Sequence, residues 1–491
     1  MKKSNVAGID LSTRSCHVVI RDLETGELVR GATASFRTKT ETNPRTWMEA
    51  YRSAVELAGG LDDVVAMSVA GQQHGFVGLG ADGNVLRQAI LWNDNRSKED
   101  AEDLIRELGR GDVSEGRKLW ADSVGSVPVS SLTVSKLRWF VDHEPQLFKH
   151  LCAIALPHDW LTWQLMGADG SRDGLEKKRD IRELVTDRSE ASGTGYYCAE
   201  KNEYRNDLID LAARSELSKR LVLPRVVGKA ESVGELKSKG EAIVLGPGCA
   251  DNAATALGLD LPPGEVCVSI GTSGVTSLVS DSPIKDRTGQ VTGFADATGR
   301  YLPLVGMLNA SRVLDDVALL LGMTLEELSR AALNAAPGAE GLVVIPYFAG
   351  ERNPRLPEGM GAVLGVSSRN LTAPNLARAA YEGIVASVAR GLSAFRRLGV
   401  EVTGITLVGG ASRTPAMRRI AASVLGLPVS VPEYSAYSAD GAARQAAWTY
   451  TGGDDPPAWT PRLRSQYQAK HDSFIIERFE EVAEKYLATV R

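Results

Sequence analysis

Cysteine is scarce in this sequence, and the few cysteines present follow no pairing pattern. Five are scattered over 491 residues without a Cys-x-x-Cys spacing, namely Cys16, Cys152, Cys198, Cys249 and Cys267. An odd, sparse set argues against a disulfide framework and against a structural zinc site. We therefore expect reduced, small core residues in a reducing compartment, and we interpret Cys249 as structural.

Long apolar runs and a strong charge excess are also missing. No apolar run approaches the roughly 20 residues of a membrane span, and Met1-Lys2-Lys3 leads directly into a strand-like run with no signal-peptide core. The formal net charge is only -5, so nothing draws the whole chain to nucleic acid or to an anionic membrane. These absences predict a cytoplasmic protein that binds neither nucleic acid nor membrane.

The composition that remains is that of a globular protein with a sizeable core. Apolar residues make up 43% and charged residues 24% of the chain, which excludes a disordered or fibrous protein. The length allows two or three domains.

The chain is organised around the stretch from Gly246 to Gly258. The apolar run 242–245 predicts a buried strand, Gly246-Pro247-Gly248 predicts a turn, and a small-residue helix follows with Asp251 or Asn252 at its N-cap. A carboxylate at a strand end, beside backbone N–H groups and a helix N-terminus, suits anionic oxygens and proton transfer. On this stretch alone, the alternative that Asp251 is only a cap stays open.

Two hairpins of one kind recur far apart in the sequence. Strands over 6–11 and 16–20 flank the turn Ser12-Thr13-Arg14-Ser15, and strands over 266–270 and 275–279 flank Gly271-Thr272-Ser273-Gly274. Turns rich in hydroxyls and small residues can present N–H and O–H donors to phosphate, and Asp10 at the end of the first strand could orient a metal ion or its waters. The recurrence predicts two related halves, each contributing a phosphate-binding turn to a cleft between them.

Other polar groups follow predicted strands or open predicted helices. Gly71-Gln72-Gln73-His74-Gly75 resembles a ligand-binding loop at a strand end, although a single histidine is more often structural. Trp92, Asn93, Asp94 and Arg96 could bind a polyol or equally form the N-cap of a helix over 97–108. Residues 186–195 read as a polar loop, too rich in hydroxyls for the core, that lines a sugar pocket or merely turns.

Taken together, these motifs resemble the FGGY carbohydrate kinase family over nearly the whole chain. The motifs that carry the resemblance, in the family's order, are Gly8-Ile9-Asp10, Gly71-Gln72-Gln73-His74-Gly75, Leu91-Trp92-Asn93-Asp94, Ala250-Asp251-Asn252, Gly271-Thr272-Ser273-Gly274, Gly350-Glu351-Arg352, Gly361 to Val366 leading to Asn375 to Glu382, and Gly409-Gly410-Ala411-Ser412-Arg413. Trp92-Asn93-Asp94 and the 186–195 stretch make the resemblance strongest to family members that phosphorylate D-xylulose.

The resemblance implies an α/β fold of two actin-like ATPase (ribonuclease H-like) domains, with nucleotide and sugar in the cleft between them. The expected domains are 1–245, mainly sugar-binding, 246–450, mainly ATP-binding, and a helical tail over 451–491. It implies ATP and Mg²⁺ as cofactors, a ketose as substrate and, by family likeness alone, a homodimer. The alternatives are another sugar or polyol kinase of the family and a non-catalytic regulator that binds sugar or nucleotide.

The resemblance also assigns roles residue by residue. Asp251 is the expected general base and Asp10 the acid of the magnesium–phosphate region, so that both are expected near the metal. The expected sugar contacts are Gln73, His74, Trp92, Asp94 and Asn252, and the expected ATP contacts are Ser12, Thr13, Arg14, Gly271, Thr272, Ser273, Gly409, Gly410, Ala411 and Arg413. The first phosphate turn departs from the family's usual Gly-Thr-Ser with a following basic residue, because Ser12 replaces the glycine and His17 the base; Arg14 is expected to supply the cation.

Overall fold

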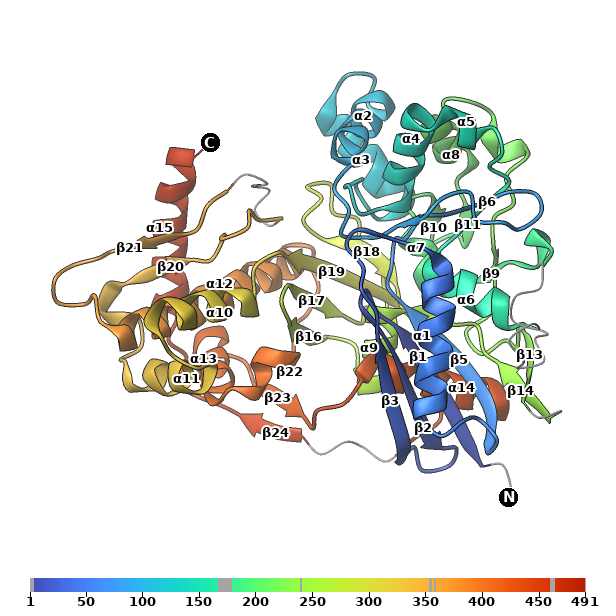
Figure 1. Ribbon diagram of the computed structural model, residues 1–491. Helices are drawn as coiled ribbons and strands as arrows, with labels where there is room; N and C mark the ends of the chain where they lie inside the picture. Colours follow the sequence, from blue (N-terminus) through green and yellow to red (C-terminus); the bar gives the residue numbers. More distant parts are fainter. Residues whose placement is uncertain are drawn as a thin grey trace. The chain divides into compact units, whose positions relative to one another are not determined.

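The chain folds into two compact α/β units, which confirms the expected fold class. The computed structural model describes residues 4–166, 179–238, 241–352, 356, 359–459 and 464–490 (Figure 1). Unit 1 consists of Met1–Asp260, Asp281–Leu302 and Ser435–Pro461, and unit 2 of Leu261–Ser280, Pro303–Tyr434 and Arg462–Arg491.

These contact-defined units are interleaved in sequence. Helix α14 (Tyr437–Thr451) packs against strands β1 and β5, which returns residues 435–461 to unit 1. The approach of α14 to β1 is so close that a Cβ on Gly8 would lie 1.9 Å from the Ala439 carbonyl oxygen. The remaining tail carries β24 (Arg464–Tyr467) and α15 (Phe474–Val490) in unit 2.

The sheet of unit 1 has the strand order β13-β14-β5-β1-β2-β3. Strands β1 and β5 are buried along their whole length. The bounds are β1 Asn5–Leu11, β2 Ser15–Asp22, β3 Leu28–Ser35, β5 Val64–Gly71, β13 Gly234–Ser238 and β14 Glu241–Leu245; the short strand β15 (Cys249–Ala250) pairs with the end of β5.

The sheet of unit 2 repeats this arrangement strand for strand. From β19 to β24, the strands of this sheet follow the order β19-β17-β16-β22-β23-β24, and the bounds are β16 Glu265–Ile270, β17 Gly274–Leu278, β19 Tyr301–Met307, β22 Gly404–Val408 and β23 Val429–Pro432. In both sheets the first strand pairs antiparallel with its hairpin partner and parallel with the strand on its other side. The outermost pairs, β13 with β14 and β24 with β23, are antiparallel in both. The shared order supports the prediction of two related halves.

Helices surround both sheets. In unit 1 they are α1 Pro44–Leu57, α2 Lys98–Leu108, α3 Val113–Val124, α4 Thr133–His143, α5 Pro145–Phe148, α6 Pro157–Leu165, α7 Arg188–Ser192, α8 Asn206–Ala213, α9 Asp251–Leu259 and α14. In unit 2 they are α10 Ser311–Leu321, α11 Leu325–Asn334, α12 Ala373–Arg397, α13 Pro415–Leu425 and α15. No helix among these described residues is long and apolar enough to cross a membrane.

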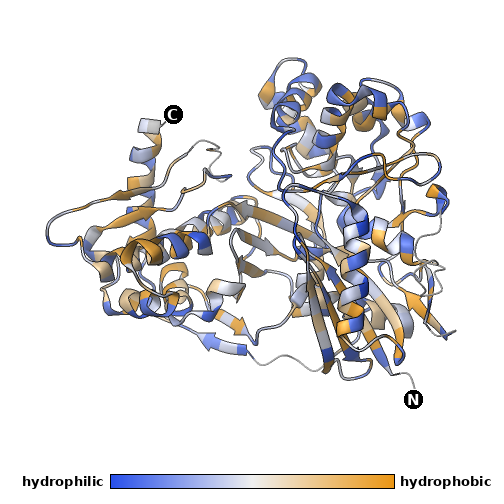
Figure 2. Cartoon of the chain, viewed as in Figure 1, coloured by the Kyte–Doolittle hydropathy of each residue, from blue (hydrophilic) through white to orange (hydrophobic). Residues whose placement is uncertain are grey.

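Helix α1 illustrates how the sequence sets these elements. The Asn43 side chain caps its N-terminus by accepting from the Arg45 N–H, and Pro44 fits the first helical turn, where its missing N–H costs nothing. Trp47, Met48 and Tyr51 recur at helical spacing and are buried against the unit 1 core. Figure 2 shows the apolar residues concentrated in the central strands.

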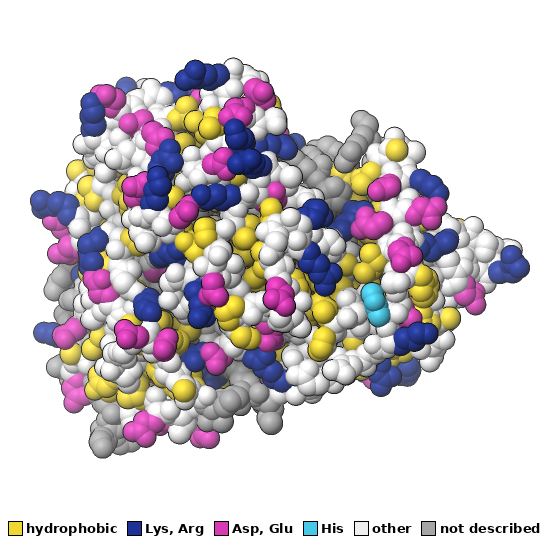
Figure 3. Space-filling model, turned by 180° about the vertical axis from the view of Figure 1, so that it is seen from behind, with side chains coloured by type: hydrophobic (Ala, Val, Ile, Leu, Met, Phe, Trp, Pro, Cys, Tyr) yellow, Lys and Arg dark blue, Asp and Glu magenta, His cyan; other side chains and the backbone are white. Residues whose placement is uncertain are grey.

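Charges of both signs are spread over the surface. In the view from behind, basic and acidic side chains of the described residues alternate (Figure 3). This distribution fits the small net charge of -5.

One local prediction was wrong. Residues 186–195, expected to be too rich in hydroxyls for the core, are buried except for Arg188 and contain α7. Burial is tolerated because the hydroxyls are satisfied locally: Ser192 Oγ donates to the Ser189 carbonyl and Thr194 Oγ1 to the Ala191 carbonyl. The stretch 169–182 is charged and contains glycines, which predicts a surface loop or insert; it falls largely outside the described residues.

Candidate active site

Asp10 lies near the end of β1, at the centre of the unit 1 sheet. Its carboxyl is buried, and Oδ2 accepts a hydrogen bond from Ser12 Oγ at 2.7 Å. Its Oδ1 is also buried and has no hydrogen-bond partner among the described residues. Burial raises the pKa of Asp10, although the nearby His17 and the Ser12 hydrogen bond partly offset this.

Asp251 flanks the same strand end from the other side. Asp10 is paired in register with Ala70 of β5, while Ala250 of β15 is paired with the next β5 residue, Gly71. Asp251 is the first residue of α9, and Ala250 is the N-cap. The prediction that Asp251 or Asn252 occupies the N-cap was therefore wrong by one residue, because β15 extends the chain up to Ala250 before the helix begins.

The surroundings of Asp251 tune it toward proton transfer near neutral pH. Its pKa is raised to about 7, first by desolvation and second by repulsion from Asp10, against hydrogen bonds that favour the charged form. Oδ1 accepts from the Asn252 backbone N–H at 2.7 Å and from Asn252 Nδ2 at 2.9 Å. A partly exposed carboxyl with a pKa close to neutrality is suited to act as a general base.

Two of the expected sugar contacts are linked to Asp251. Gln73 follows β5 and is buried, and its Oε1 accepts from Asn252 Nδ2 at 3.3 Å. Asn252 thus joins Gln73 to Asp251, so the structure brings these three predicted residues together.

His74 is held firmly and in a defined tautomer. Its backbone adopts a φ of 67°, which is uncommon for a residue other than glycine, and its carbonyl accepts from Lys136 Nζ at 2.9 Å. Its Nδ1 lies 2.7 Å from the Gly193 carbonyl oxygen. Since a carbonyl only accepts, Nδ1 carries the proton, and in the neutral ring Nε2 is the acceptor. The ring also packs against Phe294, with centroids 5.3 Å apart.

Trp92 and Asp94 have different surroundings. Trp92 Nε1 donates to Thr13 Oγ1 at 2.9 Å, which links a predicted sugar contact to the first phosphate turn. Asp94 accepts from Arg96 Nε at 2.9 Å and Nη2 at 2.8 Å, and these bonds lower its pKa against the opposing effect of burial. Within the described chain, Asp94 therefore fixes Arg96.

The first phosphate turn closes the β1–β2 hairpin, as predicted. The Ser12 N–H donates to the Ser15 carbonyl at 2.9 Å, and Arg14 at the tip is exposed. His17, which replaces the usual basic residue, is held between Ser15 and Thr33. Arg14 is thus the exposed cation of this turn.

The ATP contacts predicted in unit 2 gather at one edge of its own sheet. The turn Gly271–Ser273 follows β16 and Gly409 follows β22, and these strands are parallel neighbours with Ser269 opposite Val408. Gly409 has a φ of 90° and lies against Ile270, where a Cβ would come within 2.6 Å of backbone atoms, so only glycine fits. Beyond it, residues 410–413 form a short 3-10 helix, and the Arg413 guanidinium lies 5.1 Å from the Tyr434 ring centroid.

Sequence reasoning missed a buried polar cluster behind Asp251, which consists of His158, Asp159, Asp187, Ser189 and Glu190. Ser189 Oγ donates to Asp187 Oδ2 at 2.6 Å and accepts from the Ala250 N–H at 3.0 Å. The cluster thereby holds the residue that precedes the candidate base. In the sequence, only Asp159 stands beside strongly apolar residues, whereas Asp187 and Glu190 lie in a polar stretch.

Glu190 and His158 carry this cluster's unusual electrostatics. Both carboxyl oxygens of Glu190 are buried without a hydrogen-bond partner among the described residues. Burial, then repulsion from Asp159, Asp187 and Asp251, raises its pKa well above the usual value.

His158 is the basic side chain of the cluster. Its Nε2 lies 3.4 Å from Asp159 Oδ1 and 3.5 Å from Asp187 Oδ1. Although burial opposes its charge, these two acids raise the pKa of His158. The ring fits only because Gly248 lacks a side chain, since a Cβ there would lie 2.6 Å from His158 Nδ1.

Asp10 and Asp251 also fit the chemistry of a hard divalent cation. No group of three or more His, Cys, Asp or Glu side chains in the described part of the chain is placed to hold a metal. Mg²⁺, however, needs only one or two carboxylates when phosphate oxygens and water complete its coordination. Asp10 Oδ1 has no hydrogen-bond partner among the described residues, and the charges of Asp10 and Asp251 repel each other. A bound cation would give this oxygen a partner and would reduce the repulsion.

Comparison with known proteins establishes the family. The family's N-terminal domain matches residues 5–258 and its C-terminal domain matches residues 266–450. The chain belongs to the FGGY family of carbohydrate kinases. It is therefore an ATP-dependent sugar kinase, as the resemblance predicted.

Xylulose kinases are among the similar proteins. This FGGY kinase is 38% identical to a xylulose kinase of Streptomyces coelicolor over 462 residues, which cover 91% of this chain and 89% of that protein. It is 36% identical to a xylulose kinase of Streptomyces rubiginosus over 466 residues, 92% of this chain and 89% of that one. The crystal structure of xylulose kinase from Bifidobacterium adolescentis matches with a TM-score of 0.89 at 41% identity, covering 98% of this chain and 99% of that chain.

Proposed function

We propose that this FGGY kinase transfers the γ-phosphoryl group of ATP to a terminal hydroxyl of D-xylulose, giving D-xylulose 5-phosphate and ADP. The substrate is proposed from the similarity to xylulose kinases over most of both chains. The observation that carries the chemistry is Asp251, a partly exposed carboxyl with a pKa of about 7 beside a second acid.

Asp251 acts as the general base in this proposal. Its Oδ1 is occupied by Asn252, so Oδ2 is the oxygen that accepts the proton of the attacking hydroxyl. The hydroxyl oxygen forms the new bond to phosphorus as the bond to ADP breaks, and the proton passes to Asp251.

The remaining site residues position the two substrates. Gln73, Asn252 and the ring of His74 hydrogen-bond the ketose, while Trp92 and Asp94 shape the adjoining wall. The phosphates are bound by Ser12, Thr13 and Arg14 and by the turn of Gly271, Thr272 and Ser273. The turn of Gly409, Gly410 and Ala411, with Arg413, takes the adenosine. Asp10, supported by Asp251, would hold Mg²⁺, which supplies neutralisation of phosphate charge when bound.

A coupled ADP-release assay tests the proposal. The panel is D-xylulose, D-ribulose, L-ribulose, gluconate and glycerol with Mg²⁺ and ATP, and Asp251→Asn is the matched control. A preference for D-xylulose that the variant loses supports both substrate and base. Preference for another member of the panel would overturn the substrate while leaving the base, and ATP binding without phosphorylation of any of them would favour a sugar-binding or nucleotide-binding regulator.

A further inference from the structure

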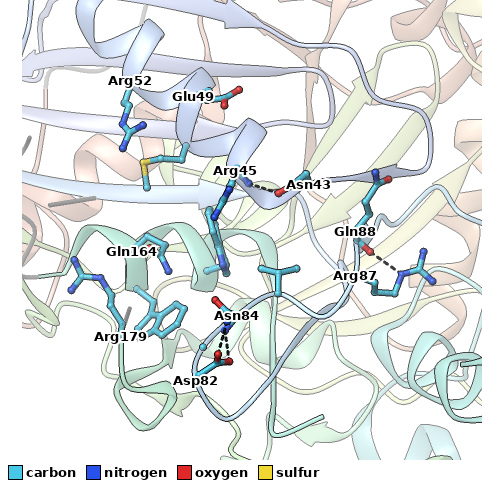
Figure 4. A pocket seen from close by; sticks show the side chains of 15 residues that line it. Asn43, Arg45, Glu49, Arg52, Asp82, Asn84, Arg87, Gln88, Gln164 and Arg179 are labelled. Carbon is cyan, nitrogen blue, oxygen red and sulfur yellow. Dashed lines mark hydrogen bonds between the residues drawn. The ribbon is translucent and has the colours of Figure 1, made fainter. Parts of the chain in front are cut away.

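A cavity lies in unit 1, and none of its lining residues belongs to the candidate active site. Its volume is about 430 Å³, within the range of small-molecule sites. In Figure 4, α1 supplies Arg45, Glu49 and Arg52 on one side, and the loop with Asp82 and Asn84 lies opposite. Helix α6 contributes Trp160, Trp163 and Gln164.

The cavity wall is rich in cationic side chains. Arginines outnumber acids among the lining residues, which include Arg45, Arg52, Arg87 and Arg179 but only Glu49 and Asp82. The charge of Arg87 is already balanced, because it pairs with Glu41 and with Glu144, neither of which lines the cavity. The other arginines leave the wall with a net positive charge.

Two of these arginines have no carboxylate partner in the described chain. Arg45 is exposed and forms no ion pair with a described residue, although Glu49 stands one helical turn away. Arg179 is partly buried and forms no ion pair with a described carboxylate; among the described residues its guanidinium donates to the Met166 carbonyl, and its Nε is buried without a described partner. Guanidinium groups that lack a protein carboxylate match phosphate and carboxylate ligands.

The rest of the wall suits a polyhydroxylated molecule. Trp160 is buried, and its Nε1–H has no hydrogen-bond partner among the described residues. Asn84, Gln88 and Gln164 add side-chain amides that both donate and accept. Aromatic faces pack against the C–H surface of sugars while amides bind their hydroxyls.

We propose that this cavity binds a phosphorylated sugar at a site separate from the candidate active site. Arg45 and Arg179 bind the phosphate, the amides bind the hydroxyls, and Trp160 packs against the carbon skeleton. This proposal does not depend on which sugar the kinase phosphorylates.

Isothermal titration calorimetry of the full chain with D-ribose 5-phosphate tests it. Arg45→Gln and Arg179→Gln each remove one cation from the wall, and Arg106→Gln is the matched control, an exposed arginine on α2 that pairs with Asp103. Each pocket variant should weaken the pocket's binding component by about tenfold or more, as loss of a charge-assisted bond does. The control should bind like the wild type, and a component that every variant retains belongs to the candidate active site.

Titrations with three further ligands, D-ribose, inorganic phosphate and AMP, identify what the cavity binds. D-Ribose and inorganic phosphate should each bind much more weakly than the sugar phosphate, and equal affinity for phosphate alone would overturn the sugar part of the proposal. Tighter binding of AMP would replace the proposed ligand by a nucleotide. Binding unaffected by either pocket variant would overturn the site itself. Both pocket variants should keep kcat and the sugar KM within about twofold of wild type, which separates this test from any failure of the proposed function.

Discussion

Replacing Asp251 by asparagine gives the sharpest test of the candidate base. Asparagine keeps the size of the side chain and an oxygen that can still accept from the Asn252 N–H, but it cannot take a proton near neutral pH. General-base assistance contributes about 10²–10⁴-fold. We therefore expect kcat to fall by about that factor while the circular dichroism spectrum stays unchanged.

The pH dependence of the reaction rate gives a second, independent quantitative test of Asp251 as the base. With a pKa of about 7, roughly one tenth of Asp251 is ionised at pH 6 and roughly nine tenths at pH 8. When both substrates are kept below half-saturation, the rate reports the ionisation of the free enzyme. The wild-type rate should then rise about tenfold from pH 6 to pH 8, and the residual rate of Asp251→Asn should lack this rise.

The variant Asp10→Asn tests whether the charge of Asp10 contributes to the raised pKa of Asp251. Removing the negative charge removes the repulsion that raises the pKa of Asp251, so the rise in rate should move to lower pH. Because desolvation is the larger cause, the midpoint should remain above the ordinary aspartate value. Only the position of the rise is compared, since Asp10→Asn also lowers the rate itself. The reasoning is refuted if Asp251→Asn turns over at near the wild-type rate, or if it keeps the wild-type pH profile.

Four other outcomes follow from the structure. Trp92→Phe and Thr13→Val each remove the same hydrogen bond, worth about 0.5–1.5 kcal/mol, so each should raise the KM for ATP and the double variant should be little worse than either. His158→Gln leaves two buried acids without their cation and should lower the free energy of urea unfolding by about 3–5 kcal/mol at pH 6; because the folded pKa of His158 is raised, this loss should shrink as the pH rises through that value. Gly8→Ala drives a Cβ into the backbone of α14 and should cost at least about 1–3 kcal/mol of unfolding free energy. The raised pKa of Asp251 means that the folded wild type loses stability as pH rises from about 4 to about 7, so Asp251→Asn should gain in Tm relative to wild type at pH 8 but not at pH 4.

Local patterns were enough to predict most of the framework. The runs 6–11 and 266–270 were predicted as first strands of hairpins, and both form as predicted because short apolar runs and short polar turns act within a few residues. The strand order could be anticipated only from the recurrence of the hairpin. The pairing of β14 with β5, and the return of α14 to the first sheet, depend on contacts far apart in sequence that no local pattern encodes.

The positions of the candidate site residues could be predicted where a polar side chain directly follows or ends a predicted strand. Asp10, Gln73 and Asp251 each follow or end a predicted strand, and the structure places them around the end of β5. The buried polar cluster was not predictable, because hydroxyls and acids in one short stretch normally indicate a surface loop. Here Ser189 and Asp187 satisfy each other locally, which allows the stretch to be buried.

The pKa of Asp251, the candidate base, could not be predicted from its position in the sequence alone. A carboxylate at the first turn of a helix is stabilised in its charged form by the helix dipole and by backbone N–H groups, and both effects lower its pKa. The hydrogen bond from the Asn252 N–H acts in this way and lowers the pKa of Asp251. The pKa is nevertheless raised to about 7. Desolvation and the charge of Asp10, which β1 brings to the other side of β5, outweigh the helix start. What poises this carboxyl near neutral pH is therefore the tertiary fold of unit 1, while its position at the start of α9 acts in the opposite direction.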